Sequence, residues 1–195
     1  MILLLSNNDN VKLLEDKLRD KYEVILYHDK ITPEYIKEID PEIVISYNYS
    51  HIVKEDVIDL LGDRIINLHC SLLPWNKGAS PNIWSFIENT PKGVTIHVLE
   101  KGLDTGRLLL QEEVFFDEDT ETLASSYNKL QETIVDLLCA NFEDILAGNI
   151  VPEIQKGEGS YHKTSDLKAL LCGREIDYSM TITEFKKFIK KSGDA

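Results

Sequence analysis

The chain contains few cysteines, and their spacing indicates neither a disulfide framework nor a metal site. It has three, Cys70, Cys139 and Cys172, which lie far apart in the sequence. Small disulfide-stabilised domains carry an even number of cysteines at short spacings, and zinc sites carry closely paired ones. We therefore expect free thiols and no bound metal. This is typical of a protein in the reducing environment of the cytoplasm.

Long apolar runs are also missing. No stretch approaches the roughly 20 apolar residues that a membrane-spanning helix needs. The apolar start of the chain, residues 2–5, is too short for a secretory signal and lacks a basic beginning and a cleavage site. The sequence therefore predicts a soluble protein that has no membrane partner.

Basic residues are scarce relative to acidic ones. The chain has 21 Lys and Arg against 34 Asp and Glu, which gives a net charge of -13. Such a surface repels the phosphates of nucleic acids unless it carries a local basic patch. The clearest basic cluster alternates with apolar residues near the C-terminus, as on the solvated face of a terminal helix: Lys186, Lys187, Lys190 and Lys191 with Phe185, Phe188 and Ile189. We expect no nucleic-acid partner.

The hydrophobic pattern of the first 69 residues predicts repeated strand and helix units. The whole chain has 195 residues, 43% of them hydrophobic, which is enough for one domain with a substantial core. Expected strands are residues 2–5, 23–27, 43–47 and 65–69. Expected helices are residues 11–18, one that starts at Thr32 and Pro33, and residues 54–61. Successive βα units of this kind favour an α/β fold with a doubly wound, mostly parallel sheet and helices on both faces.

The second half of the chain predicts a helix, two further strands and one long helix. These are expected at residues 80–89, 93–99, 107–116 and 120–146. From Asn149 onward the pattern weakens to loop or short strand, followed by a terminal helix near residues 183–191. We expect a catalytic domain over residues 1–150 and a short C-terminal extension, residues 151–195, packed against it.

Three polar residues stand where such a sheet places its ligands, beyond the carboxyl ends of the strands. Asn67 and His69 are two apart on a strand and share one face, and Asp104 lies in a glycine-bracketed turn. Each alone has a simpler interpretation, as a hydrogen-bonded pair at a strand end or as ordinary turn chemistry. Together they could stabilise an oxyanion and move a proton, which is the chemistry of acyl transfer. Cys70 points to the opposite face and is not expected to be a nucleophile.

Three motifs carry a resemblance to a known family. They are N-L-H-x-S-L-L-P-x-x-x-G-A-x-P over residues 67–81, G-V-T-I-H over residues 93–97 and G-L-D-T-G over residues 102–106. The pattern resembles the formyltetrahydrofolate-dependent formyltransferases, which include glycinamide ribonucleotide transformylase, methionyl-tRNA formyltransferase and the N-formyltransferases of nucleotide-linked amino sugars. The similarity covers roughly residues 43–138 and implies a Rossmann-like catalytic domain.

The resemblance also implies a mechanism. The catalytic Asn, His and Asp of the family correspond to Asn67, His69 and Asp104, so a neutral amine would attack the formyl carbon directly. Asn67 and a protonated His69 would donate hydrogen bonds to the oxyanion, and Asp104 would favour the charged imidazole. Neither a metal nor a covalent enzyme intermediate is required. His97, in the second motif, is interpreted as pocket lining or as a satisfied core group.

Formyltetrahydrofolate is the co-substrate that the resemblance implies. The resemblance also implies that the pterin lies between two segments. One follows the third strand and the other precedes the catalytic aspartate, and main-chain groups would make most of the contacts. The corresponding residues here are His51, Ile52, Val53, Val98, Leu99, Glu100, Lys101, Gly102 and Leu103.

The acceptor is expected to be a primary amine on a nucleotide-linked sugar. The segments Y-N-Y-S-H-I-V (residues 47–53) and G-S-Y-H-K (residues 159–163) resemble that branch of the family. Trp75 is interpreted either as a stacking surface for a base or sugar or as a loop anchor. The tRNA-dependent enzymes carry a larger C-terminal nucleic-acid-binding domain than residues 151–195 provide.

Two alternatives remain open. Glycinamide ribonucleotide is disfavoured as the acceptor because residues 6–10, Ser-Asn-Asn-Asp-Asn, lack the glycines of a phosphate-binding loop. A protein that binds folate or hydrolyses formyl-folate without an amine acceptor is the other alternative. At the C-terminal edge, the extension either forms a homodimer contact or simply covers the sheet.

Overall fold

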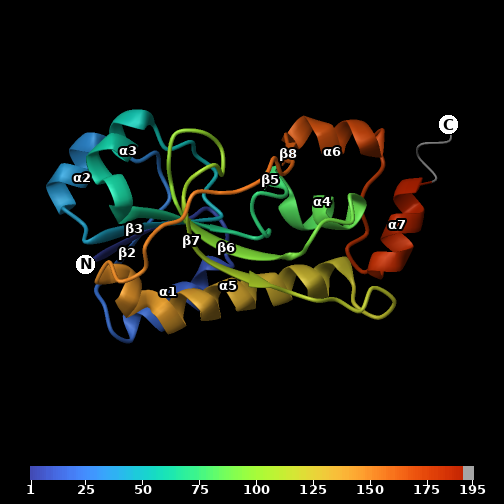
Figure 1. The fold of residues 1–195 in the computed structure, drawn as a ribbon, viewed down its shortest axis with the longest axis horizontal. Helices are drawn as coiled ribbons and strands as arrows, with labels where there is room; N and C mark the ends of the chain where they lie inside the picture. The colour runs from blue at the N-terminus through green and yellow to red at the C-terminus, as the bar shows by residue number, and fades with distance from the viewer. Residues whose placement is uncertain (191–195) are drawn as a thin grey trace.

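A six-stranded sheet forms the centre of the computed structural model, which describes residues 1–190 (Figure 1). Its strands are β1 (Ile2–Leu5), β2 (Val24–Tyr27), β3 (Ile43–Tyr47), β4 (Ile65–His69), β6 (Gly93–Val98) and β7 (Leu108–Glu113). A second, two-stranded sheet joins β5 (Lys77–Gly78) to β8 (Tyr161–His162). The helices are α1 (Val11–Arg19), α2 (Pro33–Ile39), α3 (Glu55–Leu61), the 3-10 turn η1 (Gly62–Arg64), α4 (Pro81–Ile87), α5 (Leu123–Leu146), α6 (Thr164–Leu171) and α7 (Ile182–Lys190).

The strand order is β2-β1-β3-β4-β6-β7. The first four strands in this order run parallel, whereas β6 is antiparallel to β4, and β7 is antiparallel to β6. The Rossmann-like, mostly parallel sheet expected from the sequence is therefore confirmed. Its carboxyl-end edge, where β4 delivers His69, is also where ligands bind in such sheets.

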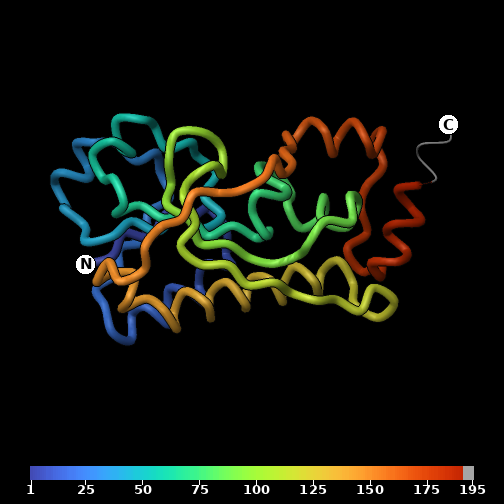
Figure 2. The backbone as a smooth tube through the Cα atoms, in the orientation of Figure 1, coloured from blue at the N-terminus to red at the C-terminus, as the bar shows by residue number. Residues whose placement is uncertain are grey.

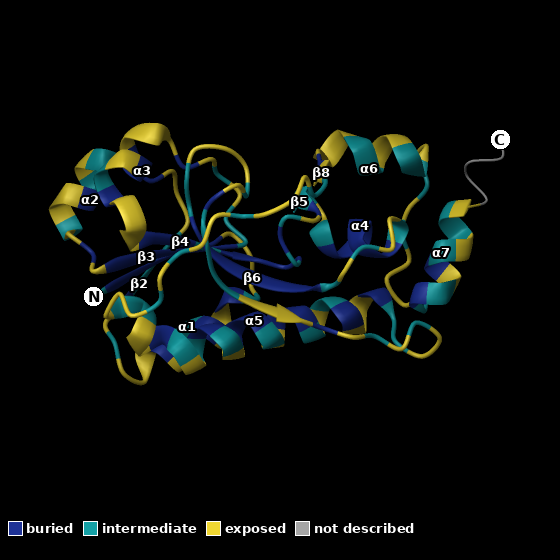
Figure 3. Ribbon diagram, in the orientation of Figure 1, coloured by how far each residue is buried: buried dark blue, intermediate teal, exposed yellow. Residues whose placement is uncertain are grey.

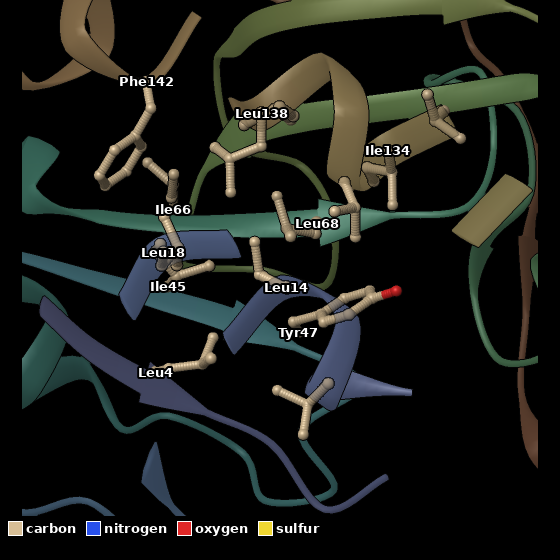
Figure 4. Close-up of a cluster of buried hydrophobic side chains, with 14 of the residues drawn as sticks. Leu4, Leu14, Leu18, Ile45, Tyr47, Ile66, Leu68, Ile134, Leu138 and Phe142 are labelled. Atoms are coloured by element: carbon tan, nitrogen blue, oxygen red, sulfur yellow. The ribbon is translucent and has the colours of Figure 1, made fainter. Parts of the chain in front are cut away.

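Helices cover both faces of the sheet because successive strand residues alternate between two apolar layers. On one face, α1 and α5 pack on alternate strand residues (Figure 4), with buried side chains such as Leu4, Leu14, Ile45, Ile66 and Leu138. On the other face, α2 and α3 pack on the intervening ones, with Leu3, Leu5, Ile36, Val44 and Val57. The four residues of β1 are apolar and wholly buried because both layers need them.

Local signals in the sequence account for several helix ends. The hydroxyl of Thr32 accepts a hydrogen bond from the Tyr35 amide at 3.3 Å, and Pro33 follows as the first helical residue of α2. Thr122 and Ser125 form a reciprocal capping box at the start of α5. Beyond the end of that helix, Gly148 takes a left-handed conformation with φ of 70°.

After α5 the chain returns across the molecule as an extended segment and reaches β5 (Figure 2). The sequence predicted only loop or short strand near residue 165, and this was wrong, because α6 lies there. None of the residues of α6 is fully buried (Figure 3), and its apolar residues Leu167, Leu170 and Leu171 span little more than one turn, too few to reveal a helical period. The expected terminal helix is α7, in which Ile182 and Phe185 are buried against α4 and α5. Lys191, placed in that helix from the sequence, lies outside the described residues.

Candidate active site

Two polar residues lie side by side on β4 and β6 at the carboxyl-end edge. Asn67 is directly opposite His97 in the antiparallel pairing of the two strands. Its side-chain Nδ2 lies 3.2 Å from Nε2 of His97, while Nδ1 of His97 donates to the Val98 carbonyl at 2.9 Å. Because the Val98 carbonyl can only accept, Nδ1 of His97 is the donor there, and Nε2 accepts from the Asn67 amide. One N–H of the amide is thereby used, and the other points to no partner among the described residues.

The turn after β6 brings Asp104 to the same place. One carboxylate oxygen of Asp104 lies 3.6 Å from Nδ1 of His69, and the other lies 3.7 Å from Nε2 of His97. The Gly78 amide donates a hydrogen bond to the first oxygen at 2.8 Å. The structure thus gathers Asn67, His69 and Asp104 around one point, with His97 between the amide and the carboxylate.

His69 is buried, with 7% of its surface exposed. Its Nε2 lies 3.1 Å from the carbonyl oxygen of Asn76, so both ring nitrogens face acceptors. Burial lowers the pKa of His69, and this outweighs the opposite effects of Asp104 and the Asn76 carbonyl. The sequence predicts that Asp104 favours the charged form of His69, and its carboxylate does act in that direction, but burial has the larger effect.

Asp104 is ionised in this setting. Burial alone would raise its pKa, but the neighbouring His69 and the hydrogen bond from the Gly78 amide hold its pKa well below the usual range. The resting site thus combines a carboxylate with a neutral imidazole.

Cys70 faces away from this cluster, as the alternation of the strand predicts. Its thiol lies in the apolar layer beneath α5, where Nε2 of Gln131 lies 2.7 Å from the sulfur. Burial raises the pKa of Cys70 to about 12, although the Gln131 contact opposes this. The thiol is therefore protonated near neutral pH and unsuited to act as a nucleophile.

A cleft of about 1340 Å³ opens above the cluster. The residues that the sequence assigned to the folate all line it except Val98, which is buried with 1% exposure. Ile52 and Leu103 expose large apolar side chains to it, at 89% and 53% exposure. An exposed apolar pair at a concave surface suits a flat heterocycle.

The far end of the cleft is lined by polar and aromatic side chains from α4, α5 and the C-terminal extension: Asn82, Tyr127, Asn128, Tyr161 and Tyr178. The loop of residues 6–10 does not line the cleft, and Asn7 in this loop instead binds the His28 carbonyl and Ser50. Trp75 also lies outside the lining.

Sequence reasoning missed Asn76 and Gln155. Asn76 occupies an unspecified position of the first motif, and its carbonyl approaches His69. Gln155 belongs to the weakly patterned C-terminal segment and donates to the Asp104 carbonyl at 2.8 Å. Nothing in the local sequence of either residue signals contacts made through the fold.

Residues 1–190 contain no helix that is both long and apolar enough to cross a membrane. Within the same part of the chain, no group of three or more His, Cys, Asp or Glu side chains is arranged to hold a metal ion.

Comparisons with known proteins agree with this geometry. The family model described as formyl transferase matches residues 4–142. The methionyl-tRNA formyltransferase of Clostridium tetani is 33% identical over 184 residues, which cover 93% of this chain and 56% of the relative. That of Clostridium botulinum is 37% identical over 75% of this chain and 49% of the relative. The chain therefore spans about half the length of these curated relatives.

Solved structures include a relative of similar length. The formyltransferase PseJ from Anoxybacillus kamchatkensis, in complex with UDP-4,6-dideoxy-4-formamido-L-AltNAc and tetrahydrofolate, is 39% identical, with a TM-score of 0.85. The match covers 93% of this chain and 95% of that one. Methionyl-tRNA formyltransferase from Clostridium thermocellum, at 17% identity and a TM-score of 0.70, shares the fold. The matched domain and these relatives show that the chain belongs to the formyl transferase family.

Proposed function

We propose that the protein transfers the formyl group of formyltetrahydrofolate to a primary amine on a nucleotide-linked amino sugar. The observation that carries this proposal is the convergence of Asn67, His69 and Asp104 at the floor of one cleft. The membership of the chain in the formyl transferase family supports the reaction class. The free cysteines fit a cytoplasmic setting for this reaction.

Asn67 is the proposed oxyanion donor. When the amine attacks the formyl carbon, negative charge develops on the formyl oxygen, and a fixed N–H in a water-poor site stabilises it. His97 holds the Asn67 amide through one N–H, which leaves the other to point into the cleft. His97 therefore acts as a positioning residue.

His69 and Asp104 are the proposed proton-handling pair. A neutral imidazole can accept the proton that the attacking amine must lose, and the adjacent carboxylate stabilises the imidazolium that results. The proton then passes to the folate nitrogen as the carbon–nitrogen bond to the folate breaks. The lowered pKa of His69 suits this role, because the base is free at neutral pH before the amine attacks.

The folate is proposed to lie at the Ile52 and Leu103 end of the cleft. The structural relative PseJ was solved with tetrahydrofolate, which supports such a ligand here. Ile52 and Leu103 offer apolar surface for the pterin, and the loop of residues 99–103 offers backbone groups. The residues present fit the group.

The relatives differ in their acceptors: the curated ones are named for methionyl-tRNA, whereas PseJ was solved with a UDP-linked formamido sugar. We favour a nucleotide-linked amino sugar for two reasons. The match to PseJ extends over 95% of that chain, and its bound product is a UDP-linked formamido sugar. The net charge of -13 also disfavours a tRNA partner.

The test is release of tetrahydrofolate, followed by absorbance, with four parallel reactions. They contain formyltetrahydrofolate with a nucleotide-linked 4-amino sugar, with glycinamide ribonucleotide, with charged initiator methionyl-tRNA, or with no acceptor. Turnover confined to the amino sugar is the expected result. Turnover with the ribonucleotide or the tRNA overturns the acceptor assignment, and equal turnover without acceptor indicates a hydrolase.

A further inference from the structure

The extended segment between α5 and α6 contacts both loops that flank His69. We call residues 149–162 the strap. It runs across the molecule from the end of α5 to β5 (Figure 2), pairing with Leu108 of β7 through Glu153 on the way. Its far end is anchored where the ring of His162 stacks on Trp84, with centroids 3.8 Å apart. The strap lies beyond residues 4–142, which the family model matches.

Gln155 of the strap holds the loop that carries Asp104. Its Nε2 donates to the carbonyl oxygens of Asp104 and Gly106, each at 2.8 Å. Two carbonyls at one atom require that atom to be the amide nitrogen, which fixes the orientation of the side chain. Asp104 has a φ of 53°, a left-handed conformation that Asp tolerates better than most residues with a side chain, and the two hydrogen bonds from Gln155 hold the turn there.

Ser160 of the strap holds the loop that carries Asn76. Its hydroxyl oxygen accepts a hydrogen bond from the backbone amide of Asn76 at 2.9 Å. The backbone amide of Ser160 donates to the Pro74 carbonyl at 3.2 Å. This close approach requires Gly159, because a Cβ there would lie 1.9 Å from the Pro74 carbonyl oxygen. Asn76 is wholly buried and also left-handed, with a φ of 57°.

The two residues held in this way are the two acceptors of the His69 imidazole. Asp104 faces Nδ1 at 3.6 Å, and the Asn76 carbonyl faces Nε2 at 3.1 Å. A neutral imidazole has one proton to share between these acceptors, so their relative positions decide which nitrogen carries it. Proton transfer needs one ring nitrogen of His69 without a proton. Which nitrogen that is depends on the relative positions of Asp104 and the Asn76 carbonyl.

We propose that Gln155 and Ser160 are positioning residues that fix the two acceptors of His69 and thereby set its tautomer. Neither residue touches the reacting atoms. The inference rests on the proposed role of His69 in proton transfer, but the tautomer itself exists whether or not the protein transfers a formyl group.

The test is 15N NMR of the histidine rings at a pH above the titration of His69, with its signals assigned through a His69→Gln variant. Gln155→Met removes the hold on Asp104, so the proton of His69 should shift toward Nε2. Ser160→Ala removes the hold on Asn76, so the proton should shift toward Nδ1. Opposite shifts from two variants on one segment are not expected from general loosening of the fold.

Two matched controls accompany these variants. Ser160→Thr keeps the hydroxyl and should restore the wild-type tautomer, and Lys156→Ala changes an exposed neighbour in the strap and should leave it unchanged. Gln155→Asn, which keeps the amide on a shorter side chain, replaces Gln155→Met if the latter does not fold. Shifts in the same direction, or unchanged His69 signals in folded variants, would overturn the proposal. The NMR experiment contains neither formyltetrahydrofolate nor an amine substrate. Absence of turnover in the assay of the wild-type protein would therefore count only against the proposed function.

Discussion

The imidazole of His69 and the carboxylate of Asp104 lie 3.6 Å apart, from Nδ1 to Oδ2, and both side chains are largely buried. Burial disfavours the charged form of each group, but only the imidazole is neutral at rest. Asp104 keeps its charge because the Gly78 amide donates a hydrogen bond to it, whereas burial lowers the pKa of His69. The pair therefore rests as a carboxylate beside a neutral base and becomes an ion pair only when it takes up a proton.

Replacing Asp104 with Asn should separate catalysis from binding. Loss of the carboxylate removes the partner of the imidazolium, so turnover should fall by about 10²–10⁴. Tetrahydrofolate binding, measured by calorimetry, should change little because the apolar end of the cleft is intact. Asp16→Asn, at an exposed position on α1, is the control. Unchanged turnover with Asp104→Asn would remove this residue from the mechanism.

Asn67→Ala should lower the rate by removing the proposed oxyanion donor. Loss of one such donor typically costs about 10²–10³ in kcat. The effect should appear in kcat rather than KM, because the charge develops only as the amine attacks. Asn141→Ala, which removes an amide that bonds within α5 at Leu137, should leave both constants near their wild-type values. A loss confined to KM would contradict the oxyanion role.

Stability should depend on pH through His69. Burial lowers its folded-state pKa below the ordinary value of 6.5, so near that pH the unfolded chain binds a proton there that the folded chain does not. The free energy of unfolding should therefore be highest above about pH 6.5 and fall as the pH drops, with a slope of up to about 1.4 kcal/mol per unit. The slope should be smaller in His69→Gln, measured by urea denaturation. The pKa of Asp104 is also lowered, so this residue adds a further loss of stability as the pH falls below its ordinary pKa of 3.8.

Ile52→Ser should weaken tetrahydrofolate binding without destabilising the protein. The side chain is 89% exposed in the free protein, so the fold gains little from it. Its burial under a bound ligand would contribute on the order of 1 kcal/mol, or about fivefold in Kd. Ile154→Ser, at a position 76% exposed and outside the cleft lining, is the matched control. Equal affinity in both variants would argue against a folate site at this end.

Phe185→Ala should show whether the C-terminal extension, as described to residue 190, unfolds together with the rest of the chain. Phe185 is wholly buried in a cluster that includes Phe86 and Leu123. Its truncation should cost about 3–5 kcal/mol in the free energy of unfolding. Phe115→Ala, at a position 77% exposed, should cost no more than about 0.5 kcal/mol. An extension that unfolds separately would instead give two transitions in Phe185→Ala.

The sheet and the central polar residues were predictable because their signals are local. Apolar strands such as residues 43–47, the helix start at Thr32 and the alternation that separates His69 from Cys70 follow from backbone geometry and side-chain size. The motifs added a resemblance to a known family, and the comparisons confirm it. Helix α6 escaped prediction because it is short and only partly buried, so its few apolar residues show no sustained period.

The protonation of His69 and the contacts that surround it were decided by the tertiary structure alone. A pKa depends on the balance of burial against neighbouring charge, and that balance arises from residues far apart in the chain. Asn76 and Gln155 reach the site through the fold, with Gln155 contacting Asp104 from 51 positions away. The sequence by itself determined which groups are present at the site, and the packing of loops and strap determined which of them carries the charge.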